Sequence, residues 1–311
     1  MLDVAEDRTT IDGYVRLFRG RADAYGGWNG RCVRSPVTPN TFRGHLNNGD
    51  MFGVYPAFNI TFDGVTEPHC VWGCTDIDYT DDPSDAVLIR TVFAQVGVTA
   101  WVERTAHGYH TWVFFDQLVR AIDVRNMFLA AHQVANIPPK EVNPKQTVLA
   151  VGQVGNYVRL PDPHYHTDGI TNRYFIDSSN ATMSLERFVQ EAVDAINPAA
   201  KAAQVAAYYI APPQPTLVVA APTQDMEQAA RQLTALGKVI WRDGPLEGGD
   251  RSSKLQHLAY ECTKAGLAPS DALLLVKDAD QRWGKYSTRG EAGQMELQRL
   301  VTRAYGSTPF S

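Results

Sequence analysis

Short apolar runs that alternate with helical patterns fill the chain from residue 51 to residue 197. Residues 52–58 and 70–77 read as strands, with a turn at Phe62-Asp63-Gly64 between them. Asp82 and Pro83 suit the first turn of a helix that Gly97 ends. Further strands are predicted at 100–104, 111–115, 141–142 and 157–160, and further helices at 119–135 and 185–196. This alternation predicts an α+β domain.

Residues 198–224 differ in composition, because alanine and proline dominate them. Such a segment is typical of a linker. Beyond it the apolar positions follow only helical spacing, over 226–236, 253–265, 270–283 and 294–305. We therefore predict three parts: an α+β domain at 1–197, a linker at 198–224 and a small all-α bundle at 225–311.

The charge balance is slightly acidic, with a formal net charge of −5 and a pI near 5.9. Contact with nucleic acid would then need a local basic patch. The sequence shows no signal peptide and no apolar run long enough to span a membrane, so we expect a cytoplasmic protein without a membrane partner. The cysteines Cys70 and Cys74 are expected to be buried structural residues, since no complete zinc set accompanies them.

The sharpest local motif is the pair Asp76 and Asp78, which follows a buried apolar strand. Alternation along a strand puts both carboxylates on one face, about 7 Å apart. Their mutual repulsion is relieved by a cation between them, and hard oxygen ligands suit Mg²⁺ or Mn²⁺.

Other polar residues lie on neighbouring strands, where they could complete a phosphoryl-transfer site. Glu141 is a candidate third carboxylate, and His110 a candidate contact to a phosphate oxygen. The cations Arg104, Lys145 and Arg159 are candidates for neutralising a triphosphate.

The order of these motifs resembles the archaeo-eukaryotic primase superfamily, the primase–polymerases, in its bacterial, phage and mobile-element branch. The similarity covers about residues 14–180 and is carried by 17–25, 45–56, 76–78, 108–115, 144–146 and 155–161. A weaker similarity joins 248–255, 265–267 and 299–305 to the helical domain that follows many such catalytic domains. The motif Gly108-Tyr109-His110 departs from the frequent Ser-x-His, so one serine contact is missing.

The resemblance implies a catalytic core with a mixed or antiparallel, partly RRM-like sheet. It implies that Asp76, Asp78 and Glu141 hold Mg²⁺ or Mn²⁺, with Asp162 as the rival third acid, and that His110 contacts the incoming nucleotide. The expected activity is DNA primase or polymerase activity on a single-stranded template with NTPs or dNTPs. A replicative helicase, in the same chain or separate, is a further expected partner.

The helical domain is expected to hold the template or the initiating nucleotide. Its candidate contacts are Arg251, Lys254 and Lys285, with Arg242, Tyr286 and Arg289 beside them. A solvated helix face explains each of these residues equally well.

Two other functions remain open on the sequence. His164-Tyr165-His166 fits an HUH endonuclease literally, although its setting is loop-like and leaves Asp76 and Asp78 unexplained. A catalytically inactive module that binds single-stranded nucleic acid would be expected to have a broken carboxylate set.

Overall fold

The computed structural model describes residues 4–27, 30–48, 52–78, 80–161, 174–211, 221–245 and 249–306. The chain divides into two compact units, Met1–Ile210 and Ala211–Ser311. The first unit extends past the expected boundary at 197, because α6 (Ala200–Ala206) buries Ala202 and Val205 in its core. The Gln133 side chain also exchanges two hydrogen bonds with the backbone of Ile210, at 2.6 and 3.1 Å.

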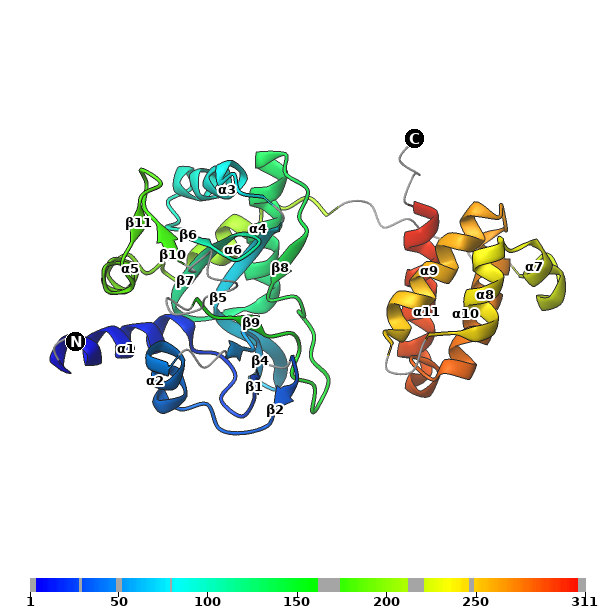
Figure 1. Cartoon of the computed structure of the whole chain (residues 1–311), viewed down its shortest axis with the longest axis horizontal. Coiled ribbons are helices and arrows are strands. Elements are labelled where there is room, and N and C mark those ends of the chain that lie inside the picture. The colour runs from blue at the N-terminus through cyan, green and yellow to red at the C-terminus, as the bar shows by residue number, and fades with distance from the viewer. Residues whose placement is uncertain are drawn as a thin grey trace. The chain divides into compact units, whose positions relative to one another are not determined.

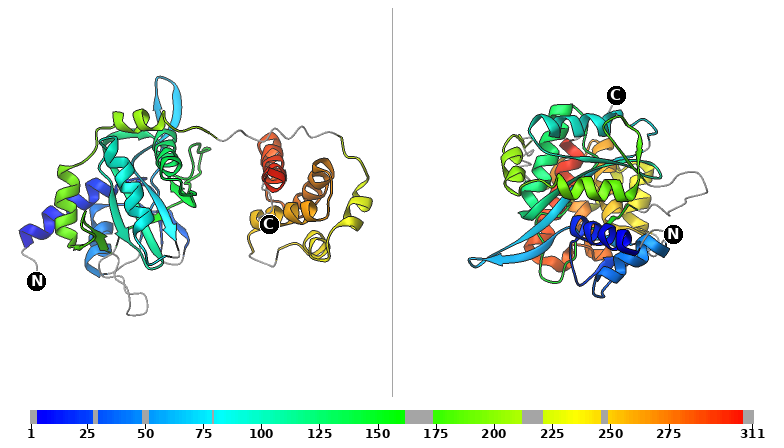
Figure 2. Two further views of the ribbon diagram at one scale, coloured as in Figure 1. Left: turned by 90° about the horizontal axis from the view of Figure 1, so that it is seen from above. Right: turned by 90° about the vertical axis from the view of Figure 1, so that its left-hand side faces the viewer.

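The main sheet of the first unit has the strand order β11-β10-β6-β7-β5-β4, with β8 also paired to β5. Its members are β4 (Phe58–Phe62), β5 (Val65–Asp78), β6 (Trp101–Arg104), β7 (Gly108–Arg120), β8 (Glu141–Asn143), β10 (Tyr174–Ile176) and β11 (Thr182–Met183). Each strand pairing within it, over the described residues, is antiparallel. On one edge of β5, β4 covers the first part and β8 the last, and the β4–β5 hairpin projects from the body of the unit (Figure 2).

The centre of this sheet is a βαββαβ unit. It runs β5, α3 (Ser84–Gln95), β6, β7, α4 (Ala121–Ala135), β8, and the strands lie in the spatial order β6-β7-β5-β8. This is the split βαβ arrangement of ferredoxin-like and RRM-like domains. The α+β class and the RRM-like sheet are therefore confirmed.

Both faces of the main sheet are covered, which explains the apolar run from Cys70 to Cys74 in β5. Figure 1 shows α3, α4 and α6 over one face, where Val102, Val113 and Phe115 are buried. The helices α1 (Val4–Phe18) and α5 (Leu185–Asp194) cover the other face, over Trp112 and Phe114.

A small antiparallel sheet packs over this second face, in the order β2-β1-β3-β9. Its strands are β1 (Tyr25–Gly26), β2 (Cys32–Val33), β3 (Gly53–Val54) and β9 (Val158–Arg159), and α2 (Pro39–Asn48) lies beside it. The single strand expected at 52–58 is therefore two strands in different sheets. The sequence analysis did not predict α2, since it found few signals before residue 51.

The second unit is all helical, as expected. It contains α7 (Met226–Gln232), α8 (Ala235–Asp243), α9 (Arg251–Lys264), α10 (Pro269–Trp283), the 3₁₀ turn η1 (Ser287–Arg289) and α11 (Gly290–Gly306). The helix expected at 226–236 is broken, because Leu233 is extended and the Thr234 hydroxyl caps a new helix by accepting from Gly237 N–H at 2.9 Å. In the described parts of both units, no helix has the length and apolarity needed to cross a bilayer.

Candidate active site

Four polar side chains form a row across the strands β8, β5, β7 and β6. The strand registers place Glu141 opposite Asp76, Asp76 opposite His110, and His110 opposite Glu103. Directly opposed residues of antiparallel strands project from the same face, so the row lies on the face that carries Trp112. The sequence-predicted residues Asp76, His110 and Glu141 are therefore brought together.

Asp78 lies on the same face, two residues along β5 from Asp76. Its partner in the register is Gly108. A Cβ on Gly108 would lie 2.0 Å from the carbonyl oxygen of Ile77, so only glycine fits there. The backbone of Ile77 and Asp78 occupies the place of a side chain at this position, which explains glycine where the resemblance leads one to expect serine.

Asp76 is poorly satisfied as a metal-free carboxylate. Its Oδ1 is buried and has no hydrogen-bond donor within the described residues, although His110 Nε2 lies 3.5 Å away. Burial raises the pKa of Asp76 to about 6, His110 opposes this, and the neighbouring Asp78 and Glu141 carboxylates add to it. The fold therefore holds a carboxylate where negative charge is costly.

Asp78 and Glu141 are each paired with a lysine. Lys140 Nζ is 2.6 Å from Asp78 Oδ2, and Lys145 Nζ is 3.1 Å from Glu141 Oε2. Partial burial acts to raise the pKa of Asp78, but the hydrogen bond and the positive charge of Lys140 outweigh it and hold this pKa below its ordinary value. The sequence analysis missed Lys140, which is adjacent to Glu141 in the chain.

The donor set fits a hard divalent cation. Asp76, Asp78 and Glu141 supply only carboxylate oxygens, and among the described residues no hydrogen-bond donor reaches Asp76 Oδ1. As the side chains stand in the described ranges, no three His, Cys, Asp or Glu residues converge closely enough to hold a metal ion. The two outer carboxylates instead contact lysine ammonium groups, which supply the compensating positive charge.

The remaining sequence-predicted cations lie in different places. Lys145 joins the row through Glu141. Arg104 pairs with Tyr109 in the register and so faces away from the row, where its guanidinium contacts Asp81 and lies 4.8 Å from the centre of the Tyr109 ring. Arg159 is exposed on β9, in the small sheet that covers the face of the row. The structure thus does not bring Arg104 to the row.

Four residues named in the sequence analysis lie outside the described residues. These are Asp162, the rival third acid, and the His164-Tyr165-His166 triplet of the endonuclease hypothesis.

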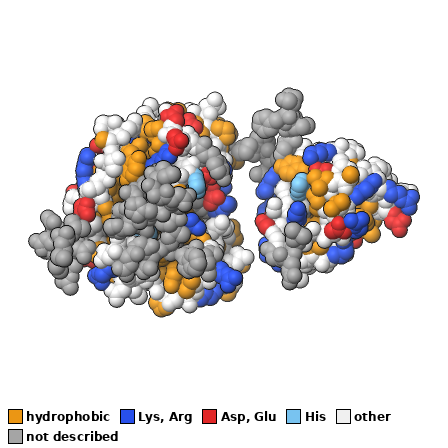
Figure 3. All heavy atoms as spheres, in the orientation of Figure 1, with side chains coloured by type: hydrophobic (Ala, Val, Ile, Leu, Met, Phe, Trp, Pro, Cys, Tyr) orange, Lys and Arg blue, Asp and Glu red, His pale blue; other side chains and the backbone are white. Residues whose placement is uncertain are grey.

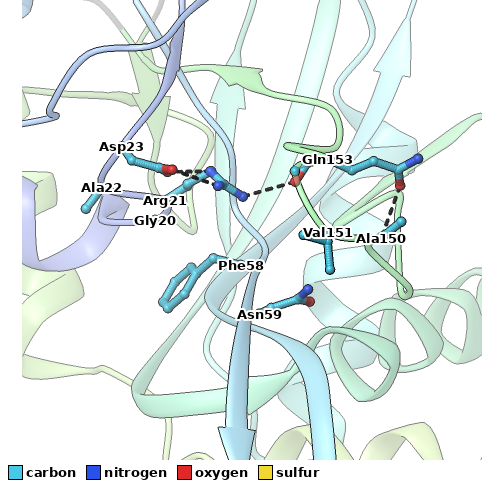
Figure 4. A pocket seen from close by; sticks show the side chains of 10 residues that line it. Gly20, Arg21, Ala22, Asp23, Phe58, Asn59, Ala150, Val151 and Gln153 are labelled. Carbon is cyan, nitrogen blue, oxygen red and sulfur yellow. Dashed lines mark hydrogen bonds and ion pairs between the residues drawn. The ribbon is translucent and has the colours of Figure 1, made fainter.

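A cavity of about 530 Å³ lies away from the row (Figure 4). It is lined by residues 20–23, Phe58, Asn59 and residues 150–153. Arg21 spans it, bound to Asp23 and, at 3.1 Å, to the carbonyl oxygen of Gln153. Phe58 is opposite His69, seven residues from Asp76 along β5, so the cavity and the row are roughly 20 Å apart. We locate the chemistry at the row, because the acid and imidazole groups gather there.

In the helical unit, the N-terminus of α9 meets the C-terminus of α10. Arg251 Nη1 donates to the carbonyl oxygens of Trp283 and Gly284, at 2.8 and 3.2 Å, which brings it beside Lys285. Lys254 lies one turn further along α9. Figure 3 shows acidic and basic side chains interspersed on the drawn face of this unit, so that view contains no broad basic surface.

An RRM-like antiparallel sheet with acidic residues and a histidine in register is the arrangement that the resemblance to the primase superfamily predicts. The family model described as the archaeo-eukaryotic primase domain of the TOTE conflict system matches residues 32–199. The chain belongs to this family. The helical unit lies outside the matched residues, and no curated protein matches the chain.

Proposed function

We propose that this protein is a template-directed nucleotidyltransferase that makes or extends primers on single-stranded DNA by metal-dependent phosphoryl transfer. The observation that carries the proposal is the row of Glu141, Asp76 and His110 in register on three adjacent strands, with Asp78 on the same face. The buried Asp76 Oδ1 supports it, because within the described part of the chain this oxygen accepts no hydrogen bond, and such an atom suits a site where a ligand binds.

Asp76, Asp78 and Glu141 would hold Mg²⁺ or Mn²⁺. When bound, these ions lower the pKa of the attacking 3′-hydroxyl and neutralise charge on the phosphates. Asp76 must be ionised to act as a ligand, and neighbouring positive charge lowers the pKa that burial raises.

The lysines would exchange partners when nucleotide and metal bind. Lys140 and Lys145 are paired with Asp78 and Glu141. With those carboxylates engaged as metal ligands, the two ammonium groups would turn to the triphosphate. His110 would contact the phosphates of the incoming nucleotide, and Arg159 would reach the nucleotide from the small sheet. Arg104, on the opposite face, would support Tyr109 and the segment after β5.

The helical unit would contact the template or the initiating nucleotide through Arg251, Lys254 and Lys285. Because primers are used where duplex DNA is opened, we extend the proposal to a replicative helicase, acting in the same chain or as a separate protein.

The test is nucleotide incorporation on a single-stranded DNA template, with labelled NTPs or dNTPs and Mg²⁺ or Mn²⁺, once without and once with an annealed primer. The controls are Asp76→Asn with Asp78→Asn, and Asp63→Asn. Asp63 is a carboxylate at the tip of the β4–β5 hairpin, and its positive φ of 49° is one that asparagine tolerates.

We expect products with the native protein and with Asp63→Asn, and none with the double variant. Products without a primer would identify a primase, and products only with a primer would identify an extending polymerase. Binding of the template with no incorporation under any of these conditions would contradict the proposal and favour an inactive binding module.

A further inference from the structure

We infer that Glu103 is a positioning residue that fixes the ring of His110. The nucleotide contact of His110 rests on the proposed function, but the geometry that holds the ring does not. Glu103 is fully buried on β6, directly opposite His110 on β7. The sequence analysis assigned it no role.

One carboxylate oxygen serves two neighbours. Glu103 Oε2 accepts a hydrogen bond from Trp112 Nε1 at 2.8 Å and lies 3.1 Å from His110 Nδ1. An indole N–H only donates, and an ionised carboxylate only accepts. The contact to His110 is therefore satisfied when Nδ1 carries a proton and donates it to Glu103.

This bond orients the other ring nitrogen. With Nδ1 held at Glu103, His110 Nε2 points to the opposite side, where it lies 3.5 Å from Asp76 Oδ1. The ring of Trp112 also packs edge-on against the imidazole, with centroids 5.5 Å apart and an interplanar angle of 76°. Glu103 and Trp112 together prevent the ring from turning, so Nε2 stays directed at the carboxylates that would hold the metal.

Two roles are conceivable for Glu103: it can orient the ring of His110, or it can serve only as an acceptor for the Trp112 indole. Trp112 alone would be satisfied by any neutral acceptor, and a buried carboxylate costs more than an amide or a carbonyl. A buried carboxylate that lies 3.1 Å from Nδ1 is suited to orient that imidazole ring, as in the carboxylate–imidazole pairs that hold catalytic histidines.

The test measures which nitrogen of His110 carries the proton. Protein labelled with ¹⁵N in histidine gives long-range ¹H–¹⁵N spectra without nucleotide or metal, and His110→Gln assigns the signals. We expect a proton on Nδ1 of His110 in the native protein. Glu103→Gln keeps an acceptor oxygen and should keep this proton, whereas Glu103→Met should release the ring and average the two nitrogen shifts. Trp112→Phe, which spares the Glu103–His110 contact, should leave the proton on Nδ1.

The kinetic readout is the KM for the incoming nucleotide. Glu103→Met should raise this KM about 10- to 100-fold with a smaller change in kcat. Glu103→Gln should keep the KM close to the native value. A native His110 without a proton on Nδ1, or an unchanged ring signal in Glu103→Met, would overturn the inference. If Glu103→Met does not fold, the native and Glu103→Gln spectra still decide. Absence of all nucleotide incorporation would refute the proposed function and leave the spectroscopic result standing.

Discussion

Asp76 in the α+β unit and Asp271 in the helical unit are both carboxylates withdrawn from solvent, yet their surroundings are opposite. Asp271 accepts hydrogen bonds from the backbone N–H of Thr223 at 2.7 Å, from its hydroxyl at 2.6 Å and from Gln224 at 3.0 Å. Burial acts to raise the pKa of Asp271, but these donors outweigh it and hold the pKa below its ordinary value. Asp76 has no donor to Oδ1 in the described structure, and its pKa is raised.

The comparison distinguishes a carboxylate whose charge stabilises the folded protein, Asp271, from one whose charge destabilises it, Asp76. The Asp271 charge connects the segment before α7 to the start of α10, so its ionised form favours folding. The Asp76 charge lies among two other carboxylates, so its ionised form opposes folding until a cation arrives. Carboxylates of the second kind are the ones expected at functional sites.

The largest expected effect is the loss of chemistry in Asp76→Asn. An amide neither carries the charge nor binds a divalent cation as a carboxylate does, so nucleotide incorporation should fall about a thousandfold or more. The same change should stabilise the metal-free first unit by ~1–2 kcal/mol, a value reduced from the full pKa shift because the side chain is partly exposed. Incorporation rates and denaturant unfolding without metal measure the two effects. An Asn variant that is both inactive and less stable would break the comparison.

The matching change in the other unit is Asp271→Asn. It should lower the free energy of unfolding of the helical unit by about 2 kcal/mol, because one amide oxygen cannot satisfy the three donors that now converge on the carboxylate. Chemistry at the row should continue at temperatures where the unit remains folded. Thermal unfolding followed by circular dichroism measures the loss of stability, and the incorporation assay measures whether chemistry continues.

The two carboxylates should also give opposite pH dependences. The raised pKa of Asp76 makes its contribution to stability fullest below the ordinary aspartate pKa, and this contribution is lost as the pH rises through about 6. Activity, which needs the ionised form, should increase over the same interval. The lowered pKa of Asp271 gives stability that is present above the ordinary aspartate pKa and is lost as the pH falls through the lowered value. Activity profiles between pH 4 and 8, and unfolding profiles extended down to about pH 2, on the native protein and both Asn variants would show these signs.

The smallest effect is expected for the lysines of the row. Lys140→Met and Lys145→Met each remove a half-exposed ion pair, so stability should change by less than about 0.5 kcal/mol. If the ammonium groups turn to the triphosphate, the KM for nucleotide should rise roughly tenfold for each variant. Unchanged KM values in both variants would restrict the lysines to compensating the carboxylates.

Local patterns predicted part of this site. Alternation alone placed Asp76 and Asp78 on one face, and β5 bears this out. The neighbours of Asp76 could not be derived in the same way, because strand register depends on contacts between residues far apart in the chain. His110 and Glu141 were candidates from their places on neighbouring predicted strands, and the resemblance then implied their roles. Arg104 shows why this prediction fails. It lies opposite Tyr109, and the neighbouring Glu103 lies opposite His110, so a difference of one residue decides which side chain faces the row.

In the fold, too, local patterns predicted some elements and missed others. The helices and strands with clear periodicity were predicted, whereas α2 and the break at Leu233 were not, because each depends on a short capped or weakly patterned segment. The boundary at 197 followed from Asn197-Pro198 and the alanine-rich composition. Packing of α6 against α4 moved it to 210, which composition could not indicate.

The most direct test of the central claim is Mn²⁺ binding to the native protein, followed by the electron paramagnetic resonance signal of free Mn²⁺, with Asp76→Asn and Asp271→Asn beside it. The account predicts that the native protein and Asp271→Asn take up Mn²⁺ and that Asp76→Asn does not. Equal uptake by all three proteins would show that the donor-free carboxylate is not a metal ligand, and it would contradict the assignment of the row as the active site.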